Sequence, residues 1–244
     1  MTRSHAVSWV ATGLGAARER IRETCRDCPM LKTPFQQALR GRSTACPMIH
    51  GRYRQGQVLF QQGNPATRIY AVKSGLLKTY KTEPGGRHQL MDLLGPGDVL
   101  ALEAVRAEEY CVGAEALADS EACFMERARL LELVGQSVPL ALEVIRSLSQ
   151  SVMDCRSRML DLGTKTAKAR LASFFMRLIP PDLAEATSAD IHIPISRSEI
   201  ADLIGVTPET ISRLLQHLTA RRIIAASGKR LRVLDVIRLQ ASAR

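Results

Sequence analysis

The sequence predicts an α+β protein with an N-terminal antiparallel β-roll, a long dimerisation helix and a C-terminal winged helix-turn-helix. Three observations predict this order: short β-type runs between glycine turns in residues 52–130, a heptad pattern over residues 138–162, and paired helix signals around Gly205. The 244 residues are 45% hydrophobic and 24% charged, as in an ordinary globular protein, and suffice for two small domains.

Residues 1–51 are predicted to form an N-terminal arm with a cysteine motif. Cys25 and Cys28 make a C-x-x-C, which can place two thiolates on one metal. Six cysteines in a chain of this length do not indicate a secreted disulfide framework. The sequence has no apolar run long enough to span a bilayer, so we expect a cytoplasmic protein without a membrane partner.

Residues 52–135 are predicted to form the β-roll. Their strand-like runs lie about 8–12 residues apart, a spacing typical of an antiparallel sandwich or barrel. Turns such as Ser74-Gly75 and Pro84-Gly85-Gly86 separate them. The runs are Val58–Phe60, Ile69–Val72, Leu76–Tyr80, Gln89–Leu94 and Val99–Leu102.

Residues 136–164 are predicted to form one long helix. Apolar or neutral residues recur at alternating steps of three and four, which is the seam of a coiled coil with a second subunit. Packing of the helix on its own roll is the alternative, and both arrangements are compatible. The expected dimer seam is Ile145, Leu148, Val152, Cys155 and Met159, within the pattern Val138, Ala141, Ile145, Leu148, Val152, Cys155, Met159 and Leu162.

Residues 165–244 are predicted to form the DNA-binding domain, beginning with an amphipathic helix over Ala167–Leu178. Ser196 and Glu199 then form a capping box that begins a further helix. A tight turn at Gly205 follows it. Thr207 and Pro208 are the N-cap and first-turn residues of the next helix. This succession predicts a helix-turn-helix.

The second helix of this motif has a polar face, because its apolar residues Ile211, Leu214, Leu215 and Leu218 form one stripe. Arginine can bond two acceptors of a guanine edge, and a carboxylate can accept from the cytosine amino group. Such residues near the start of this helix enter the major groove. A solvated surface helix is the alternative.

A hairpin wing is predicted next, with runs Ile223–Ala226 and Leu231–Leu234 around a basic glycine turn. Residues 165–244 hold 13 Lys+Arg and 7 Asp+Glu, so +6 of the net charge of +10 lies there. Positive charge neutralises phosphates, and we expect double-stranded DNA as the partner. The candidate DNA contacts are Thr207, Glu209, Thr210, Ser212, Arg213, Gln216, Lys229 and Arg230.

Over about residues 25–238 the chain resembles the CRP/FNR family of bacterial transcription regulators. The likeness is densest in Gln55–Lys81, Gly95–Leu100 and Gly205–Leu218, and the run E-T-I-S-R is typical of the FNR-like branch. The resemblance implies that Glu209, Ser212 and Arg213 read a TTGAT-type half-site. It further implies a homodimer on a palindrome like TTGAT-N4-ATCAA, contact with RNA polymerase, and activation of transcription.

The same resemblance bears on the signal. Cyclic-nucleotide sensors of the family carry an Arg-Ser pair and a Gly-Glu pair. In this chain the Arg-Ser positions fall on Gly113-Ala114, and the Gly-Glu positions fall near Ala101-Leu102. Without a charge to hold the phosphate, no cyclic nucleotide is expected. The alternative is a CRP-like regulator that senses another small ligand.

FNR-like proteins hold a 4Fe–4S cluster, and the resemblance implies such a cluster on Cys25, Cys28 and Cys123, with Cys46 as the best remaining ligand. The family's further ligand just after the C-x-x-C is missing here. An oxygen- or redox-sensing regulator is therefore one reading. The other has an exposed dithiol at Cys25 and Cys28, a buried Cys123, and control by abundance or thiol oxidation.

An enzyme is not expected. The five histidines are scattered, and the sequence has no Ser-His-Asp arrangement, P-loop or dinucleotide fingerprint.

Overall fold

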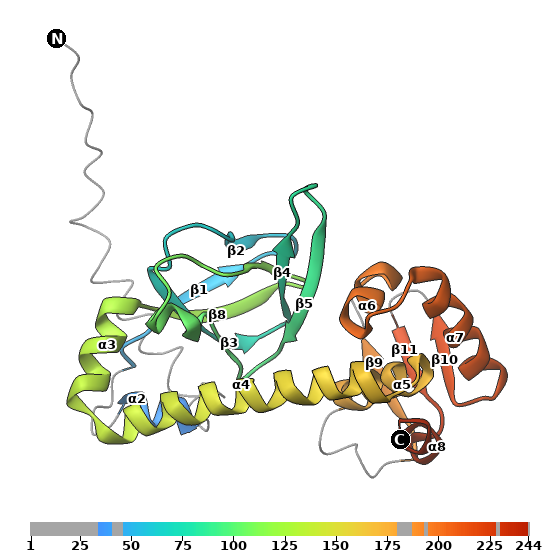
Figure 1. Cartoon of the computed structure of the whole chain (residues 1–244). Helices are drawn as coiled ribbons and strands as arrows, with labels where there is room; N and C mark the ends of the chain where they lie inside the picture. Colours follow the sequence, from blue (N-terminus) through green and yellow to red (C-terminus); the bar gives the residue numbers. More distant parts are fainter. Residues whose placement is uncertain (1–33, 41–45, 180–186, 193–194, 228–229, 244) are drawn as a thin grey trace.

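The computed structural model describes residues 34–40, 46–179, 187–192, 195–227 and 230–243. A β-roll lies along one side of a long helix, α4 (Val138–Thr164), and the helix-turn-helix lies near the far end of that helix (Figure 1). This is the predicted order of elements. No helix in the described ranges combines the length and the hydropathy needed to cross a membrane.

The roll is made of two four-stranded antiparallel sheets. One has the order β1-β8-β3-β6 and the other β2-β7-β4-β5. The first sheet consists of β1 (Ile49–Tyr53), β8 (Ser120–Glu126), β3 (Arg68–Ser74) and β6 (Val99–Leu100). The second consists of β2 (Val58–Phe60), β7 (Gly113–Ala116), β4 (Leu77–Thr82) and β5 (His88–Leu94).

Glycine turns separate the strands, as predicted. Gly75 between β3 and β4 has φ +86°, and a Cβ at this position would collide with Ser120, so only glycine fits. The run predicted over Val99–Leu102 is shorter than expected, because Ala101 adopts a left-handed conformation with φ 61°. The chain then enters a short 3₁₀ helix, η2 (Leu102–Val105).

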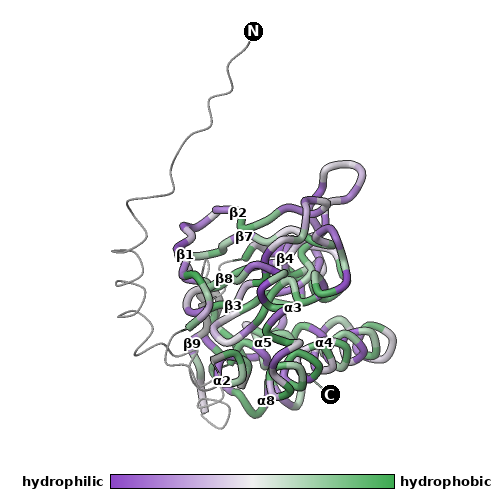
Figure 2. The backbone as a smooth tube through the Cα atoms, turned by 90° about the vertical axis from the view of Figure 1, so that its left-hand side faces the viewer, coloured by the Kyte–Doolittle hydropathy of each residue, from purple (hydrophilic) through white to green (hydrophobic). Residues whose placement is uncertain are grey.

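Helix α4 packs on its own roll through one face. Leu140 and Val144 are buried in the core of the roll, each contributing about 1.5–3 kcal/mol of apolar burial. Helix α3 (Arg127–Gln136) leads into α4, and α2 (Pro34–Arg40) packs beside it with Phe35 buried. Figure 2 shows hydrophobic and hydrophilic residues alternating along α4. The other face of α4 is the exposed one.

The C-terminal part combines helices with a three-stranded sheet of order β10-β11-β9. Its helices are α5 (Ala167–Leu178), α6 (Arg197–Ile204), α7 (Pro208–Ala220) and α8 (Val236–Ser242). Its strands are β9 (Ala189–His192), β10 (Ile224–Ser227) and β11 (Arg230–Val233). The predicted helix over Ala167–Leu178 and the hairpin wing are present, and β9 adds a third strand to the wing.

Inside the roll, an aromatic side chain fills the space beside Gly113. A Cβ at Gly113 would lie 2.5 Å from the Tyr80 ring, and Tyr80 is itself buried and stacked on His88. Gly113 in β7 pairs with Tyr80 in β4 across the sheet. Glycine is therefore required at this position by close packing.

Replacing Gly113 by alanine should destabilise the protein by about 1–3 kcal/mol, because the new methyl group overpacks against Tyr80. Urea unfolding would measure the loss. Gly85→Ala is the matched control, since nothing lies within 4 Å of the position that its Cβ would take. Equal midpoints for the two variants would contradict this account of the packing.

Candidate nucleic-acid interface

Helix α6 begins and ends as predicted. The Ser196 hydroxyl accepts the backbone N–H of Glu199 at 3.2 Å, and the Glu199 carboxylate accepts the backbone N–H of Ser196 at 2.8 Å. This reciprocal capping box satisfies two amides that a helix start leaves unpaired. Gly205 ends the helix with φ 65°. This left-handed conformation favours glycine, and a Cβ there would in addition lie 2.8 Å from the end of the Leu162 side chain.

Helix α7 follows after this turn. The Thr207 hydroxyl accepts the backbone N–H of Thr210 at 3.3 Å, and Pro208 occupies the first turn. Ile211 and Leu218 are fully buried and fix which side of the helix faces the core. The predicted polar face is therefore the outer face of α7.

The outer face of α7 carries the candidate DNA contacts. Thr207, Glu209, Arg213 and Gln216 are exposed, and Thr210 and Ser212 are half-buried. The Arg213 guanidinium donates to the Thr210 hydroxyl at 3.4 Å. Such a weak contact leaves most of the guanidinium's donors to a ligand.

Glu209 is ionised at neutral pH. Its pKa lies below the usual value because the carboxylate accepts its own backbone N–H and the Thr207 hydroxyl, with Arg213 nearby. An ionised carboxylate only accepts hydrogen bonds, which suits an amino group rather than a carbonyl.

Arg197 is a residue that the sequence reasoning missed. It stands at the start of α6, and its guanidinium donates to the Ser212 hydroxyl of α7 at 3.2 Å. Ser212 in turn donates to the Pro208 carbonyl at 3.1 Å. Arg197 therefore adds positive charge beside the outer face of α7, and the only sequence signal was a basic residue directly after the N-cap.

Arg170 of α5 is a second residue that was missed. Its guanidinium donates to the carbonyls of Ile204 at 2.7 Å, Lys165 at 2.8 Å and Gly205 at 3.3 Å. The Ile204 and Gly205 carbonyls are among those that the end of α6 leaves without helical partners. Arg170 thereby connects the end of α6 to the junction between α4 and α5.

The wing residues are less completely described. Lys229 lies outside the described residues. Arg230 begins β11, where it pairs with Ser227 of β10 and with His192 of β9. The candidate wing contacts stay predictions.

The expected dimer seam lies mostly on the exposed face of α4. Ile145 is 57% exposed, Val152 49% and Met159 66%, and Cys155 is exposed as well. Leu148 differs from them because it is half-buried and packs against the core of its own roll. Four of the five expected seam residues are therefore exposed, and the fifth, Leu148, contacts its own roll.

The predicted cluster ligands are not gathered within the described part of the chain. Cys25 and Cys28 lie outside it. Cys123 is 3% exposed in the middle of β8, between His50 of β1 and Ala71 of β3. The half-buried Cys46 thiol donates to the side-chain oxygen of Gln36 at 3.6 Å. Among the described residues, no group of three or more metal-ligating side chains comes together.

Two family models match the chain. A cyclic nucleotide-binding domain matches residues 50–137, and a Crp-like helix-turn-helix domain matches residues 169–242. The first match covers the roll, where Gly113 and Ala114 are the residues expected at the positions of the family's Arg-Ser pair. Both residues are buried there, and the Tyr80 ring occupies the space in which a longer side chain at Gly113 would lie.

Characterised proteins are similar over most of the chain. The transcriptional activator protein Anr of Pseudomonas protegens is 33% identical over 224 residues, which is 90% of this chain and 92% of that protein. The anaerobic regulatory protein of Pasteurella multocida is 31% identical over 187 residues. These residues are 76% of this chain and 68% of that protein.

Solved structures share the fold. The structure of FixK2 from Bradyrhizobium japonicum has 29% identity and a TM-score of 0.71, and it covers 81% of this chain and 98% of that one. The similarity thus extends over the roll, the long helix and the winged helix-turn-helix together.

Proposed function

This chain belongs to the CRP/FNR family of transcription regulators, and from that premise we propose that it binds a TTGAT-N4-ATCAA-like palindrome as a homodimer. It is a regulator with a DNA-binding helix-turn-helix and not an enzyme. Its relatives are named as transcriptional activators. We propose the same effect here, exerted through contact with RNA polymerase.

The outer face of α7 is the observation that carries the proposal. An exposed arginine and an ionised glutamate stand one helical turn apart in the first half of the helix, on the side opposite the buried Ile211 and Leu218. Arg213 would read the guanine of the half-site and Glu209 the cytosine amino group. Thr207, Thr210, Ser212 and Gln216 would contact phosphates or neighbouring base edges. Lys229 and Arg230 of the wing would contact phosphates.

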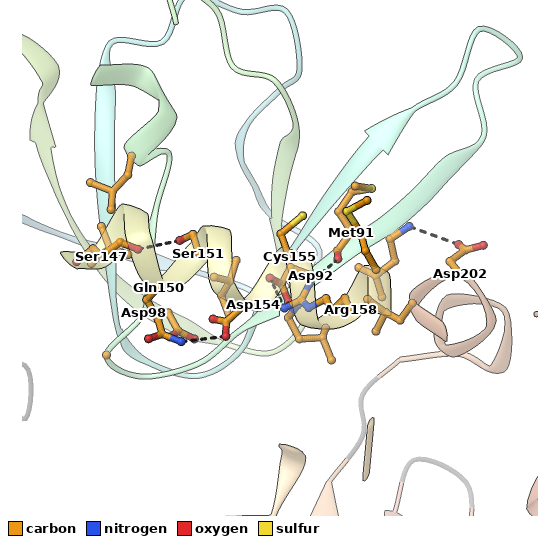
Figure 3. A pocket seen from close by; sticks show the side chains of 18 of the residues that line it. Met91, Asp92, Asp98, Ser147, Gln150, Ser151, Asp154, Cys155, Arg158 and Asp202 are labelled. Carbon is orange, nitrogen blue, oxygen red and sulfur yellow. Dashed lines mark hydrogen bonds and ion pairs between the residues drawn. The ribbon is translucent and has the colours of Figure 1, made fainter. Parts of the chain in front are cut away.

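The homodimer is supported by the exposed apolar face of α4. A groove of about 800 Å³ runs between this helix and β5, and Cys155, Met159 and Leu162 of the heptad pattern line it (Figure 3). An apolar face of this length on one helix favours a helix of a second copy as its partner. Two helix-turn-helix units could then reach two half-sites about one DNA turn apart.

For the signal, we propose a response to oxygen or redox state. The names of two relatives, an anaerobic regulatory protein and an electron transport regulator, favour it. The candidate ligands of a 4Fe–4S cluster remain Cys25, Cys28, Cys46 and Cys123. The described residues supply only two of these sulfurs, fewer than the four that such a cluster takes, so no step is assigned to a cluster.

Arg213→Ala should weaken binding to the TTGAT-type palindrome by about 1–3 kcal/mol and remove discrimination at the guanine, because the bidentate contact is lost. Fluorescence anisotropy with the consensus duplex and a guanine-substituted duplex measures both effects. Arg221→Ala, an exposed residue just after the end of α7, is the matched control. An unchanged preference for guanine in Arg213→Ala would refute the assignment.

Ile145→Asp should shift the protein to monomers, because a charge would enter the exposed apolar face of α4 at a seam position. Analytical ultracentrifugation measures the change. Met153→Asp serves as the control, since Met153 is 62% exposed on the same helix but lies off the seam. Ile145 is preferred to Leu148, whose replacement would also disturb the core of the roll. If the Ile145→Asp variant remained a dimer, that result would contradict the predicted dimer seam.

Protein purified without oxygen should bind the palindrome more tightly than the same protein after exposure to air. Iron and acid-labile sulfide, measured on both samples, distinguish a cluster from thiol oxidation. Iron-free protein that loses binding in air and regains it with a thiol reductant indicates the cysteines alone. Equal affinity in both samples would overturn the redox proposal and leave control by abundance.

A further inference from the structure

Helix α6 lies against the open edge of the β-roll. In the sheet order β2-β7-β4-β5, strand β5 is an edge strand, and α6 packs beside it. The Asp202 carboxylate accepts the backbone N–H of Leu90 in β5 at 3.4 Å (Figure 3). Edge strands carry amides without strand partners, and a covering helix is one way of protecting them. The first helix of the helix-turn-helix performs this function here.

A charged bridge joins α6 to β4, the neighbour of β5 in the same sheet. Lys78 of β4 donates to the Glu199 carboxylate of α6 at 2.9 Å, and its ammonium is 3.5 Å from Glu115 of β7. The side chains of Lys78 and Glu199 are only 15% and 25% exposed. The bridge is therefore better shielded from solvent than an ordinary surface ion pair.

Both partners of the bridge are held in their charged forms. Burial tends to raise the pKa of Glu199, but hydrogen bonds from the Ser196 backbone and from Lys78 outweigh it and keep the pKa below its usual value. Burial tends to lower the pKa of Lys78, yet Glu199 and Glu115 raise it above its usual value. The bridge is thus intact throughout the neutral pH range.

Apolar residues of the roll complete the contact. Leu90 and Leu117 are 3% and 6% exposed, and they belong to the same buried cluster as Ile200 and Ile204 of α6. Leu76 and Leu93 are half-buried against that cluster. The helix-turn-helix and the second sheet of the roll therefore share one core.

The two ends of α6 are held by different parts of the chain. Arg170 binds the carbonyls at its C-terminal end, close to the junction of α4 and α5, and Lys78 binds Glu199 near its N-terminal end. A body that is attached at one end only can rotate about that attachment. The second attachment, to the roll, removes this freedom.

We propose that Lys78 is a positioning residue that sets half-site spacing: through Glu199, it holds each helix-turn-helix at the orientation suited to one spacer length. This inference rests on the proposed function, the binding of a palindrome by a dimer. Half-site spacing in this class of motif is set by the geometry of two recognition helices, about 34–36 Å apart for one DNA turn. A helix-turn-helix released from the roll would adapt to neighbouring spacings with less strain.

The test compares duplexes in which the two half-sites are separated by three, four or five base pairs, together with a duplex that carries one half-site. Wild-type protein should prefer the four-base-pair spacer. Lys78→Met should reduce that preference by about fivefold or more, the size of a typical coupling between sites. Its affinity for the single half-site should stay within about twofold of wild type, because the outer face of α7 is untouched.

Two further variants make the comparison specific. Glu199→Gln removes the charge but keeps a side chain that completes a capping box, so it should reduce the preference as Lys78→Met does. Lys81→Met is the control, because Lys81 is an exposed lysine of the same strand and should leave the preference unchanged. The double variant of Lys78→Met and Glu199→Gln should lose no more than either single variant.

Each outcome has a distinct meaning. If the variants keep the wild-type spacer preference, the proposed role of the bridge is refuted. The proposed binding of a palindrome by a dimer is unaffected by that result. A uniform loss on all duplexes, the single half-site included, would also refute the role of the bridge, since Lys78 would then support folding or phosphate binding. Wild-type protein that bound none of the duplexes would refute the proposed function, and this inference with it.

Discussion

The contact between α6 and the second sheet of the roll, centred on its edge strand β5, is the interaction on which the arrangement of this molecule depends. Without it, the helix-turn-helix and the roll would be joined only through α4 and the two residues Lys165 and Thr166 that precede α5. With it, the same helix that begins the DNA-binding motif also closes the sheet. The roll and the helix-turn-helix are consequently one packed body.

The apolar and polar parts of this contact have different effects. Burial of Leu90 and Leu117 supplies most of its free energy, about 1.5–3 kcal/mol for each fully buried leucine side chain. The Lys78–Glu199 pair adds about 1 kcal/mol or less after desolvation is subtracted. Apolar burial alone tolerates small rotations, however, because it has no direction. The charged bridge therefore determines orientation more than stability.

The local features of this fold were predictable from the sequence, and the long-range ones were not. The capping box at Ser196, the turn at Gly205 and the cap at Thr207 depend on neighbours three or four residues away, and the structure confirms them. Tyr80 against Gly113 depends on strand pairing between residues 33 positions apart, and Lys78 with Glu199 on a contact across 121 positions. A single sequence carries no periodic signal for such pairs.

The cysteines illustrate the same limit. Spacing indicated that Cys25 and Cys28 form a pair, but it could not indicate that Cys123 lies buried between two neighbouring strands. Cys123 stands in the middle of β8, because that strand continues to Glu126. Burial depends on what packs around a strand, and Cys123 is flanked by β1 and β3, which come from much earlier in the chain.

The second sheet of the roll also contacts α4, through strand β5. Arg158 of α4 donates two hydrogen bonds of 2.8 Å to Asp92, two residues after Leu90 (Figure 3). Each of these side chains is 38% exposed, so salt and water screen the pair more than they screen Lys78 and Glu199. Of the two ion pairs that leave this sheet, the one to α6 is therefore the better shielded. In this molecule, the more direct connection between roll and DNA-binding motif is through the sheet edge, with the long helix as the second route.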